Sequence, residues 1–273
     1  MHAEVTIARE VYVQKAFCTV NPLWCSYVLL NRWDHEGLSS PYWRWYWNDR
    51  PGASIEYSTS RLNLDPGHVV LIPPNTVFAT HTDRQVGHLH CHFWLSTRLV
   101  SDTAGPIRLP ISRADRERLR SAIRLMDRQE EQQREPRISL NILSLVADAL
   151  ARAQYDWDVQ NHDPLVDHVR QRIHAAPAQK QLDNKTLAKD VGVSVNTLLR
   201  RFHRATGTSP RQFSLQLRVE RGADLLRSGD MSIPEIAELC GFIDRYHFTR
   251  AFTARSGTSP SAFRKRYRMN EFT

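Results

Sequence analysis

The pattern of apolar and polar positions divides the chain into two unlike halves. From residue 11 to residue 110, short aromatic and β-branched runs alternate with Pro, Gly and Asn breaks. Runs of this length, bounded by turn residues, are typical of antiparallel strands. The pattern predicts strands over 42–47, 69–75 and 88–95, with turns at 51–52 and 65–67. An antiparallel β-barrel or β-sandwich is therefore expected.

Apolar positions at helical spacing follow the strand region. Residues 112–131 and 138–155 are predicted to form two helices, separated by a polar run around Pro136. Leu119, Ile123 and Met126 form one apolar stripe. The second stripe consists of Ile138, Ile142, Leu145, Val146, Ala149 and Leu150. Such stripes can pack on the barrel of their own chain, or they can join two subunits as an antiparallel helix pair.

Near its C-terminus the chain contains the same pattern twice. Residues 201–210 and 251–260 align at an offset of 50 positions and end in the same Gly-Thr-Ser-Pro sequence. Further upstream, Ala188 aligns with Ala237 and Gly192 aligns with Gly241, at an offset of 49. A helical unit has therefore been duplicated, with one residue added inside the second copy.

Each copy has the spacing of a helix-turn-helix. In the first copy, Gly192 permits a left-handed turn and Ser194 can cap the next helix. Leu198 and Phe202 then share one helix face. The equivalent residues of the second copy are Ala237, Gly241, Asp244, Phe248 and Phe252. A small helical bundle would also contain such residues, but two tandem copies favour a unit whose second helix enters the DNA major groove.

The charge distribution indicates a polyanionic partner for the second half alone. Residues 164–273 contain 19 Lys and Arg against 10 Asp and Glu, a net charge of +9, whereas the whole chain has +8. The first 163 residues therefore carry a net charge of −1. Membrane surfaces are polyanionic too, but the sequence has no basic amphipathic helix and no continuous apolar run of about 18 residues. Double-stranded DNA is the expected partner, and no membrane association is expected.

The segment 187–264, above all 232–242, 246–252 and 257–264, resembles the DNA-binding domain of the AraC/XylS transcription regulators. The resemblance implies seven helices, two helix-turn-helix units and a rigid connecting helix, for which 210–227 is suited. At about 1.5 Å per residue this connector is about 27 Å long, which fits two successive major-groove turns about 34 Å apart. The resemblance also implies a bacterial cytoplasm and RNA polymerase as a further partner.

The helical faces predict which side chains meet DNA. Arg200 and Arg250 fall where the family commonly has a DNA contact. The guanidinium of an arginine can pair with guanine, and the amide of Asn196 can form hydrogen bonds with adenine. The predicted DNA-binding residues are Ser194, Asn196, Arg200, His203, Asp244, Arg245, Tyr246, Thr249 and Arg250, with Ser194 and Asp244 as helix caps. Lys185 and Arg255 are predicted phosphate contacts. A solvated helix face is the alternative for each of these residues, and Arg201 can instead lie between helices.

The first 110 residues resemble, more weakly, the small-barrel sensory domain of the arabinose-sensing branch of this family. The matching segments are 32–37, the turn before 71–75, and the strand that includes 88–93. The resemblance implies a cupin-like barrel that binds a small-molecule effector, often a sugar. Arg32, His88 and His90 fall at ligand positions of that branch, and Trp43 or Trp45 can stack on a sugar ring. The sequence leaves open which face of the 42–47 strand points inward.

Two other functions are compatible with parts of the sequence. His88, His90 and His92 share one strand face and could ligate zinc or iron, as in a cupin metalloenzyme fused to a DNA-binding tail. However, the other ligands of a metal-binding cupin are missing near 40–45 and near Phe78, and no catalytic motif is present. We therefore expect no enzyme activity, no cofactor and no bound metal. The second alternative is an architectural DNA binder with an empty barrel.

The predicted organisation is an α+β chain with two domains. Residues 1–110 are predicted to form the cupin-like barrel, 111–156 a helical dimerisation segment, 157–163 a linker, and 164–273 the DNA-binding domain. The four cysteines lack Cys-x-x-Cys spacing and are expected to be free thiols. No secretory leader is expected either. The sequence thus predicts a cytoplasmic, homodimeric, ligand-responsive regulator of transcription, such as an activator.

Overall fold

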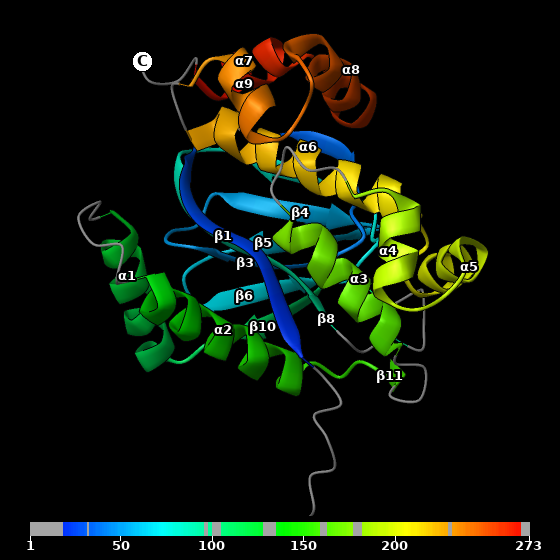
Figure 1. Cartoon of the computed structure of the whole chain (residues 1–273). Coiled ribbons are helices and arrows are strands. Elements are labelled where there is room, and N and C mark those ends of the chain that lie inside the picture. The colour runs from blue at the N-terminus through cyan, green and yellow to red at the C-terminus, as the bar shows by residue number, and fades with distance from the viewer. Residues whose placement is uncertain are drawn as a thin grey trace, which may run out of the picture.

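The computed structural model describes residues 19–31, 33–95, 98–99, 105–127, 135–158, 163–176, 182–228 and 231–268. Within these ranges an N-terminal β domain packs against a C-terminal helical domain (Figure 1). The predicted α+β class with two domains is therefore confirmed.

The β domain consists of two antiparallel sheets. The larger sheet has the order β1-β8-β3-β6-β10, with strands Val20–Leu30, Val86–Leu95, Trp43–Asn48, His68–Ile72 and Ile107–Pro110. The smaller sheet has the order β2-β7-β4-β5, with strands His35–Leu38, Phe78–Thr82, Ala53–Tyr57 and Ser60–Leu64. No strand ladder among the described residues joins the outer strands of one sheet to those of the other. The expected closed barrel is therefore replaced by the two-sheet alternative.

Strands β3 and β8 are buried on both faces, because α1 and α2 cover one face of the larger sheet and the smaller sheet packs on the other. One face of that sheet packs against helices α1 (Arg113–Asp127) and α2 (Glu135–Arg152). Leu119, Ile142 and Val146 from these helices share a core with Trp45 and Phe93. The apolar stripes thus pack largely on the β domain of their own chain. This is one of the two alternatives that the sequence left open; the other was an antiparallel helix pair between two subunits.

The C-terminal part contains seven helices in its described residues, as predicted. They are α3 (Pro164–Ala175), α4 (Asn184–Asp190), α5 (Val195–Thr206), α6 (Pro210–Ser228), α7 (Ile233–Leu239), α8 (Arg245–Ser256) and α9 (Pro260–Arg268). The predicted linker begins with a short strand, β11 (Trp157–Asp158), which pairs with β9 (Arg98–Leu99). None of the helices in the described ranges is long and apolar enough to cross a membrane.

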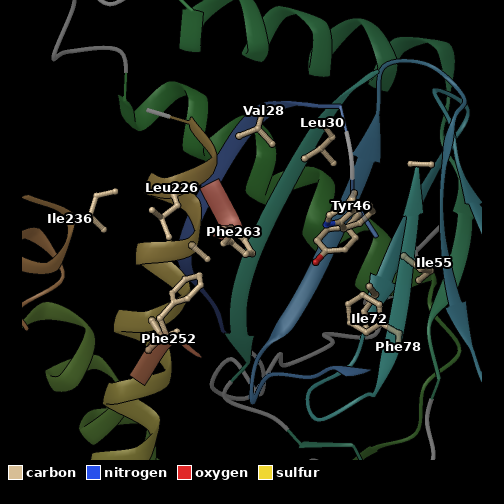
Figure 2. Packing of buried hydrophobic residues seen from close by; sticks show 14 of the residues in the cluster. Val28, Leu30, Tyr46, Ile55, Ile72, Phe78, Leu226, Ile236, Phe252 and Phe263 are labelled. Atoms are coloured by element: carbon tan, nitrogen blue, oxygen red, sulfur yellow. The ribbon is translucent and has the colours of Figure 1, made fainter. Parts of the chain in front are cut away.

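Helix α6 is the connector between the two helix-turn-helix units. Its Phe213 packs edge-on against Phe202 of the first unit, with ring centroids 5.6 Å apart. Leu226 of α6 shares a core with Phe252 of the second unit, and this core continues into the β domain (Figure 2). Gly222 allows the closest approach, since a Cβ there would lie 2.6 Å from the ring of Phe248. The connector is therefore packed on both units.

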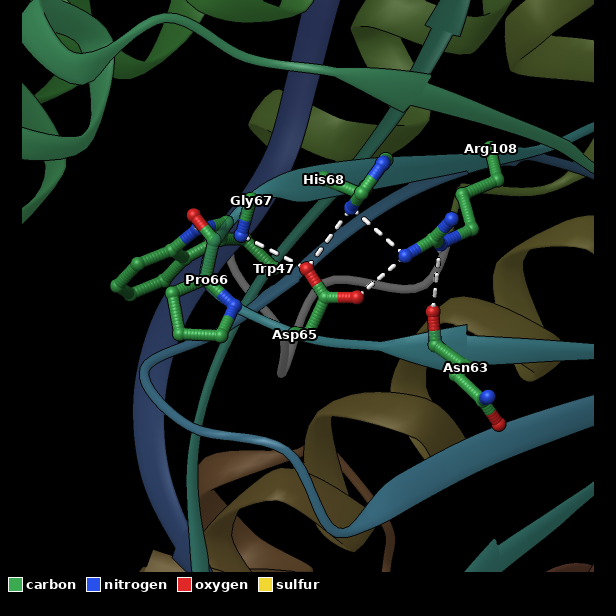
Figure 3. A network of polar contacts seen from close by, with 7 residues as sticks. All are labelled: Trp47, Asn63, Asp65, Pro66, Gly67, His68 and Arg108. Carbon is green, nitrogen blue, oxygen red and sulfur yellow. Dashed lines mark hydrogen bonds and ion pairs between the residues drawn. The ribbon is translucent and has the colours of Figure 1, made fainter.

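A polar network fixes the turn between β5 and β6 (Figure 3). The Asp65 carboxylate accepts hydrogen bonds from the backbone N–H of Gly67 and from Arg108, and it lies 2.8 Å from Nδ1 of His68. Arg108 also donates to the backbone carbonyl of Asn63. Burial raises the pKa of Asp65, but hydrogen bonds from His68, Arg108 and Gly67 lower it more, so the net pKa lies below its usual value. The network ties β10 of the larger sheet to the β5–β6 turn and to β5 of the smaller sheet.

We predict that Asp65→Asn lowers the free energy of unfolding at pH 7 by about 1 to 3 kcal/mol, because the Arg108 guanidinium loses a charged partner. The folded-state pKa of Asp65 lies below the unfolded one, so its contribution is complete above about pH 4 and is lost as the pH falls through the folded value. Urea unfolding at several pH values measures both effects.

The matched control is Asp83→Asn, since Asp83 pairs with Arg84 at an exposed position. Exposed pairs contribute little, so this variant should unfold like the original chain. Equal unfolding midpoints for Asp65→Asn and Asp83→Asn would show that the network does not stabilise the turn.

Candidate functional site

The first helix-turn-helix consists of α4 and α5. Gly192 has φ +67° and makes the turn between them, and the Ser194 hydroxyl accepts a hydrogen bond from the N–H of Thr197, capping α5. Leu198 and Phe202 are fully buried beneath α5. Gly207 ends the helix in a left-handed conformation with φ +71°. The start and the buried face of α5 are thus as predicted from the sequence, and Gly207 ends the helix.

The second unit, α7 and α8, is held by the same devices. Ser232 and Glu235 form a capping box at the start of α7, and Gly241 makes the turn with φ +72°. The Asp244 carboxylate accepts a hydrogen bond of 2.7 Å from the N–H of His247 and caps α8. Phe248 and Phe252 are fully buried beneath α8. The predicted caps Ser194 and Asp244 are thus confirmed as caps.

The outward faces of α5 and α8 carry polar and basic side chains. The exposed residues among those predicted to bind DNA are Asn196, Arg200 and His203 on α5, and Arg245, Tyr246 and Arg250 on α8. Thr249 is half-buried, and Lys185 is exposed in the first turn of α4. The guanidinium of Arg245 lies 4.7 Å from the ring centroid of Tyr246, and its Nη2 donates to the Tyr246 hydroxyl. Each helix thus presents hydrogen-bond donors on its outer face.

Arg255, predicted to contact phosphate, contacts the β domain in this structure. Its guanidinium donates to the backbone carbonyl of Ser39 and to the Ser40 hydroxyl of the β domain. It also pairs with Glu220 of α6, at 3.4 Å. These partners hold Arg255 against the β domain and against α6, although the residue stays exposed. Local sequence could not show these contacts, because Ser39 and Ser40 lie more than two hundred residues away in the chain. The predicted phosphate contact of Arg255 stays a prediction.

Arg201 lies between helices, which is one of the two positions predicted for it. It forms a two-pronged ion pair with Asp163, with N–O distances of 2.6 and 2.8 Å. Asp163 is the N-cap of α3. Burial raises the pKa of Asp163, but the hydrogen bonds from Arg201 lower it more, so the net pKa is below its usual value. Arg201 therefore fixes α3 on α5.

The space between the two sheets contains a row of buried polar side chains. His88, His90 and His92 of β8 are each less than 7% exposed, and neighbouring rings are 5.5 and 4.9 Å apart. Tyr46 and Asn48 of β3 lie opposite His90 and His88, and Asn48 Oδ1 lies 2.8 Å from Nδ1 of His88. Figure 2 shows Tyr46 in the same space. This interior is polar where a sandwich core is usually apolar.

Some buried polar atoms of this interior have no hydrogen-bond partner in the described part of the chain. They are Nδ2 of Asn48 and the hydroxyls of Thr80 and Thr82 on β7. Buried polar groups are normally paired, so such atoms are places where a bound polar molecule can be held. No group of three His, Cys, Asp or Glu side chains among the described residues is arranged to hold a metal ion.

The remaining predicted ligand contacts lie away from this row. Trp43 and Trp45 point to the other face of β3, where they are buried among residues of α1 and α2. They form structural core, and their predicted stacking role is not supported. Arg32 lies outside the described residues. Of the five predicted ligand residues, the structure brings together His88 and His90.

Sequence reasoning missed the residues that join the interior to the helical domain. Arg44 of β3 is buried opposite His92, and its Nη2 donates to the Ser40 hydroxyl at 2.6 Å. Ser40 in turn donates to Glu220, at 3.0 Å. The alternation along β3 put Arg44 and Tyr46 on one face, but nothing in the sequence placed Ser40 beside α6. We call Arg44, Ser40, Glu220 and Arg255 the interdomain bridge.

Comparisons with known proteins match the C-terminal part most closely. A helix-turn-helix domain family matches residues 187–266. The MmsAB operon regulatory protein of Pseudomonas aeruginosa is 34% identical over 109 residues, 40% of this chain and 34% of that protein. The Msm operon regulatory protein of Streptococcus mutans is 34% identical over 105 residues, 38% of this chain and 37% of that protein. The matches thus span little more than a third of these relatives.

Solved structures of ToxT resemble nearly the whole chain in fold. ToxT from Vibrio cholerae has a TM-score of 0.54, covering 89% of this chain and 98% of ToxT, at 12% sequence identity. At this identity the likeness concerns the arrangement of the β domain and the helical domain, and not their ligands.

We predict that Glu220→Ala loosens the interdomain bridge, because Ser40 and Arg255 lose their shared acceptor. A loss of about 1 kcal/mol corresponds to about fivefold faster amide hydrogen exchange in α8 and around Ser40. Glu238→Ala is the control, an exposed acidic residue on α7. Unchanged exchange in Glu220→Ala would show that the bridge does not hold the domains together.

Proposed function

We propose that this chain is a transcription regulator of the AraC/XylS family, with its DNA-binding domain at residues 187–266. In this proposal the chain reads a two-part DNA site, and a small molecule controls the binding. The observation that carries this proposal is the pair of helix-turn-helix units, each with a capped recognition helix and a polar outer face, packed at the two ends of α6.

In the proposed complex α5 and α8 enter successive turns of the major groove. The connector α6 has 19 residues, which makes it about 28 Å long and close to the repeat of about 34 Å along one DNA face. Arg200 and Arg250 are proposed to pair with guanines, and Asn196 to read an adenine. His203, Arg245, Tyr246 and Thr249 line the same two faces.

Lys185 and the N-terminal ends of the two recognition helices are proposed to meet phosphates. Lys185 is exposed at the start of α4, and helix N-termini present backbone N–H groups to anions. Ser194 and Asp244 support these contacts indirectly, because their side chains already cap α5 and α8. Phosphate contacts position the protein but do not select a sequence.

The interior of the β domain is proposed to bind the effector. The buried row of His88, His90, Tyr46 and Asn48 supplies hydrogen-bond donors and acceptors in a space shielded from water. A small polar molecule with several hydroxyl groups, such as a sugar, fits this chemistry better than an apolar one. Binding sites of this kind place a few polar groups within an otherwise apolar surround.

The interdomain bridge is the proposed route from effector to DNA. Arg44 lies on the same sheet face as the histidine row and contacts Ser40, which contacts Glu220 on the connector and Arg255 on α8. An effector that competes for Arg44 would change how the second unit is held against the β domain. The second unit can be held against the β domain or released from it, and the effector binds one of these two arrangements more tightly. The difference between the two binding free energies limits how far the effector can change DNA binding.

The proposal includes the remaining partners of such a regulator. A homodimer would place four recognition helices on DNA. Because the apolar stripes of α1 and α2 are buried within the chain, the dimer interface would involve other surfaces. RNA polymerase in a bacterial cytoplasm would be the partner of an activator. Relatives such as the MmsAB operon regulatory protein are named as regulators, which supports this class of function.

We predict that Arg250→Ala weakens binding to the selected DNA site by about 1 to 3 kcal/mol and relaxes the preference at one base pair. Lys185→Ala is the comparison: it should weaken binding to all sequences alike and reduce the salt dependence. Titrations with single-base variants of the site separate these patterns. If Arg250→Ala weakened all sequences equally, Arg250 would be a phosphate contact and not a base reader.

We also predict that one class among sugars, sugar acids and aromatic acids raises the thermal stability of the full chain. An effector at 100 times its Kd adds about 2.7 kcal/mol to the free energy of unfolding. His90→Gln should abolish this gain, whereas His81→Gln, at an exposed position on β7, should keep it. A gain that survives His90→Gln would place the effector outside the histidine row.

A further inference from the structure

The two helix-turn-helix units correspond closely at their turns, with one difference. The N–H of Val193 bonds to the carbonyl of Ala188 at 3.0 Å, and the N–H of Phe242 bonds to the carbonyl of Ala237 at 2.8 Å. In the first unit the next residue is the cap of the recognition helix, Ser194. In the second unit one residue intervenes between Phe242 and the cap. That inserted residue is Ile243.

Ile243 has no place in the core of its unit. Phe242 is buried, with its ring centroid 5.2 Å from that of Phe248 and 4.2 Å from the guanidinium of Arg218. Phe242 is therefore the equivalent of Val193 in the first unit. The side chain of Ile243 is 89% exposed, the highest value among the large hydrophobic residues described. Neither packing nor the hydrogen bonds of the turn explain an isoleucine at this position.

Ile243 is one of three exposed apolar residues in the segment from the end of α7 to the first turn of α8. Leu239 at the end of α7 is 40% exposed, and Tyr246 in the first turn of α8 is 62% exposed. The same end of α8 carries the exposed Arg245, and Arg250 lies further along the helix. The N-terminal end of a recognition helix is the part that approaches base edges in the major groove. An apolar side chain framed by basic ones therefore faces DNA in the proposed function.

We propose that Ile243 contacts the 5-methyl group of a thymine in the half-site that α8 reads. This methyl group is the apolar feature of the major groove, and an apolar side chain recognises it by contact. The proposal rests on the proposed function and deepens it. The first unit has no counterpart of Ile243, so this contact distinguishes the half-site that α8 reads from the half-site that α5 reads.

The experiment begins with the full chain and a random pool of double-stranded DNA, from which bound sequences are enriched and sequenced. Each thymine of the selected site is then replaced singly by deoxyuridine, which removes only the methyl group. The original chain should lose about fourfold in affinity at one thymine of the half-site contacted by α8, the equivalent of one buried methyl or methylene group. Ile243→Ala should bind the unmodified site about fourfold less tightly.

The decisive result is the combination of the two changes. Ile243→Ala should show no further loss when that thymine becomes deoxyuridine, whereas Ile243→Val should keep most of the sensitivity. Leu140→Ala, an exposed apolar residue of α2, should behave like the original chain. An Ile243→Ala variant that loses as much as the original chain at the same deoxyuridine would overturn the proposal.

Other outcomes distinguish the inference from the function on which it rests. If Ile243→Ala kept full affinity and methyl sensitivity but failed to stimulate transcription with purified RNA polymerase, Ile243 would contact protein and the thymine proposal would be wrong. If the original chain enriched no sequence at all, the proposed function itself would fail. Sequence-specific binding without any methyl-sensitive thymine would overturn the inference alone.

Discussion

The packing of α6 against both helix-turn-helix units is the constraint on which the DNA-binding arrangement depends. Phe213 and Leu217 share a core with Phe202, and Leu226 shares one with Phe252. Gly222 lets α8 approach so closely that any larger residue would meet the ring of Phe248. Glycine inside a helix costs roughly 0.5 to 1 kcal/mol relative to alanine, so this close contact is obtained at the expense of helix stability. The two recognition helices therefore keep a defined separation.

The same connector also contacts the β domain. Glu220 of α6 receives hydrogen bonds from Ser40 of the β domain and from Arg255 of α8. In the other half of the helical domain, Arg170 of α3, whose side chain is 11% exposed, donates to the carbonyl of Leu95. Removal from water lowers its pKa to about 10 despite the nearby Asp167. Two polar contacts thus join the helical domain to the β domain, as the proposed control by a small molecule requires.

Local signals made the helical domain predictable from sequence, and long-range contacts limited the rest. Gly192, Ser194 and their repeats each act within a few residues, so the turns, caps and buried faces followed from spacing. Strand β3 was found for the same reason, but both of its faces are buried, and only α1 and α2 decide that Trp45 is core. The position of Arg255 depends on Ser39 and Ser40, more than two hundred residues earlier, which no local pattern contains.

The most direct test of this account is a hydroxyl-radical footprint of the full chain on its selected DNA site, followed by insertion of five base pairs between the protected segments. The account predicts two protected segments on one face of the DNA, about 10 base pairs apart from centre to centre. The insertion should greatly weaken binding, because α6 cannot follow half a helical turn. A single protected segment, or unchanged affinity after the insertion, would contradict the two-part reading by a rigid pair of units.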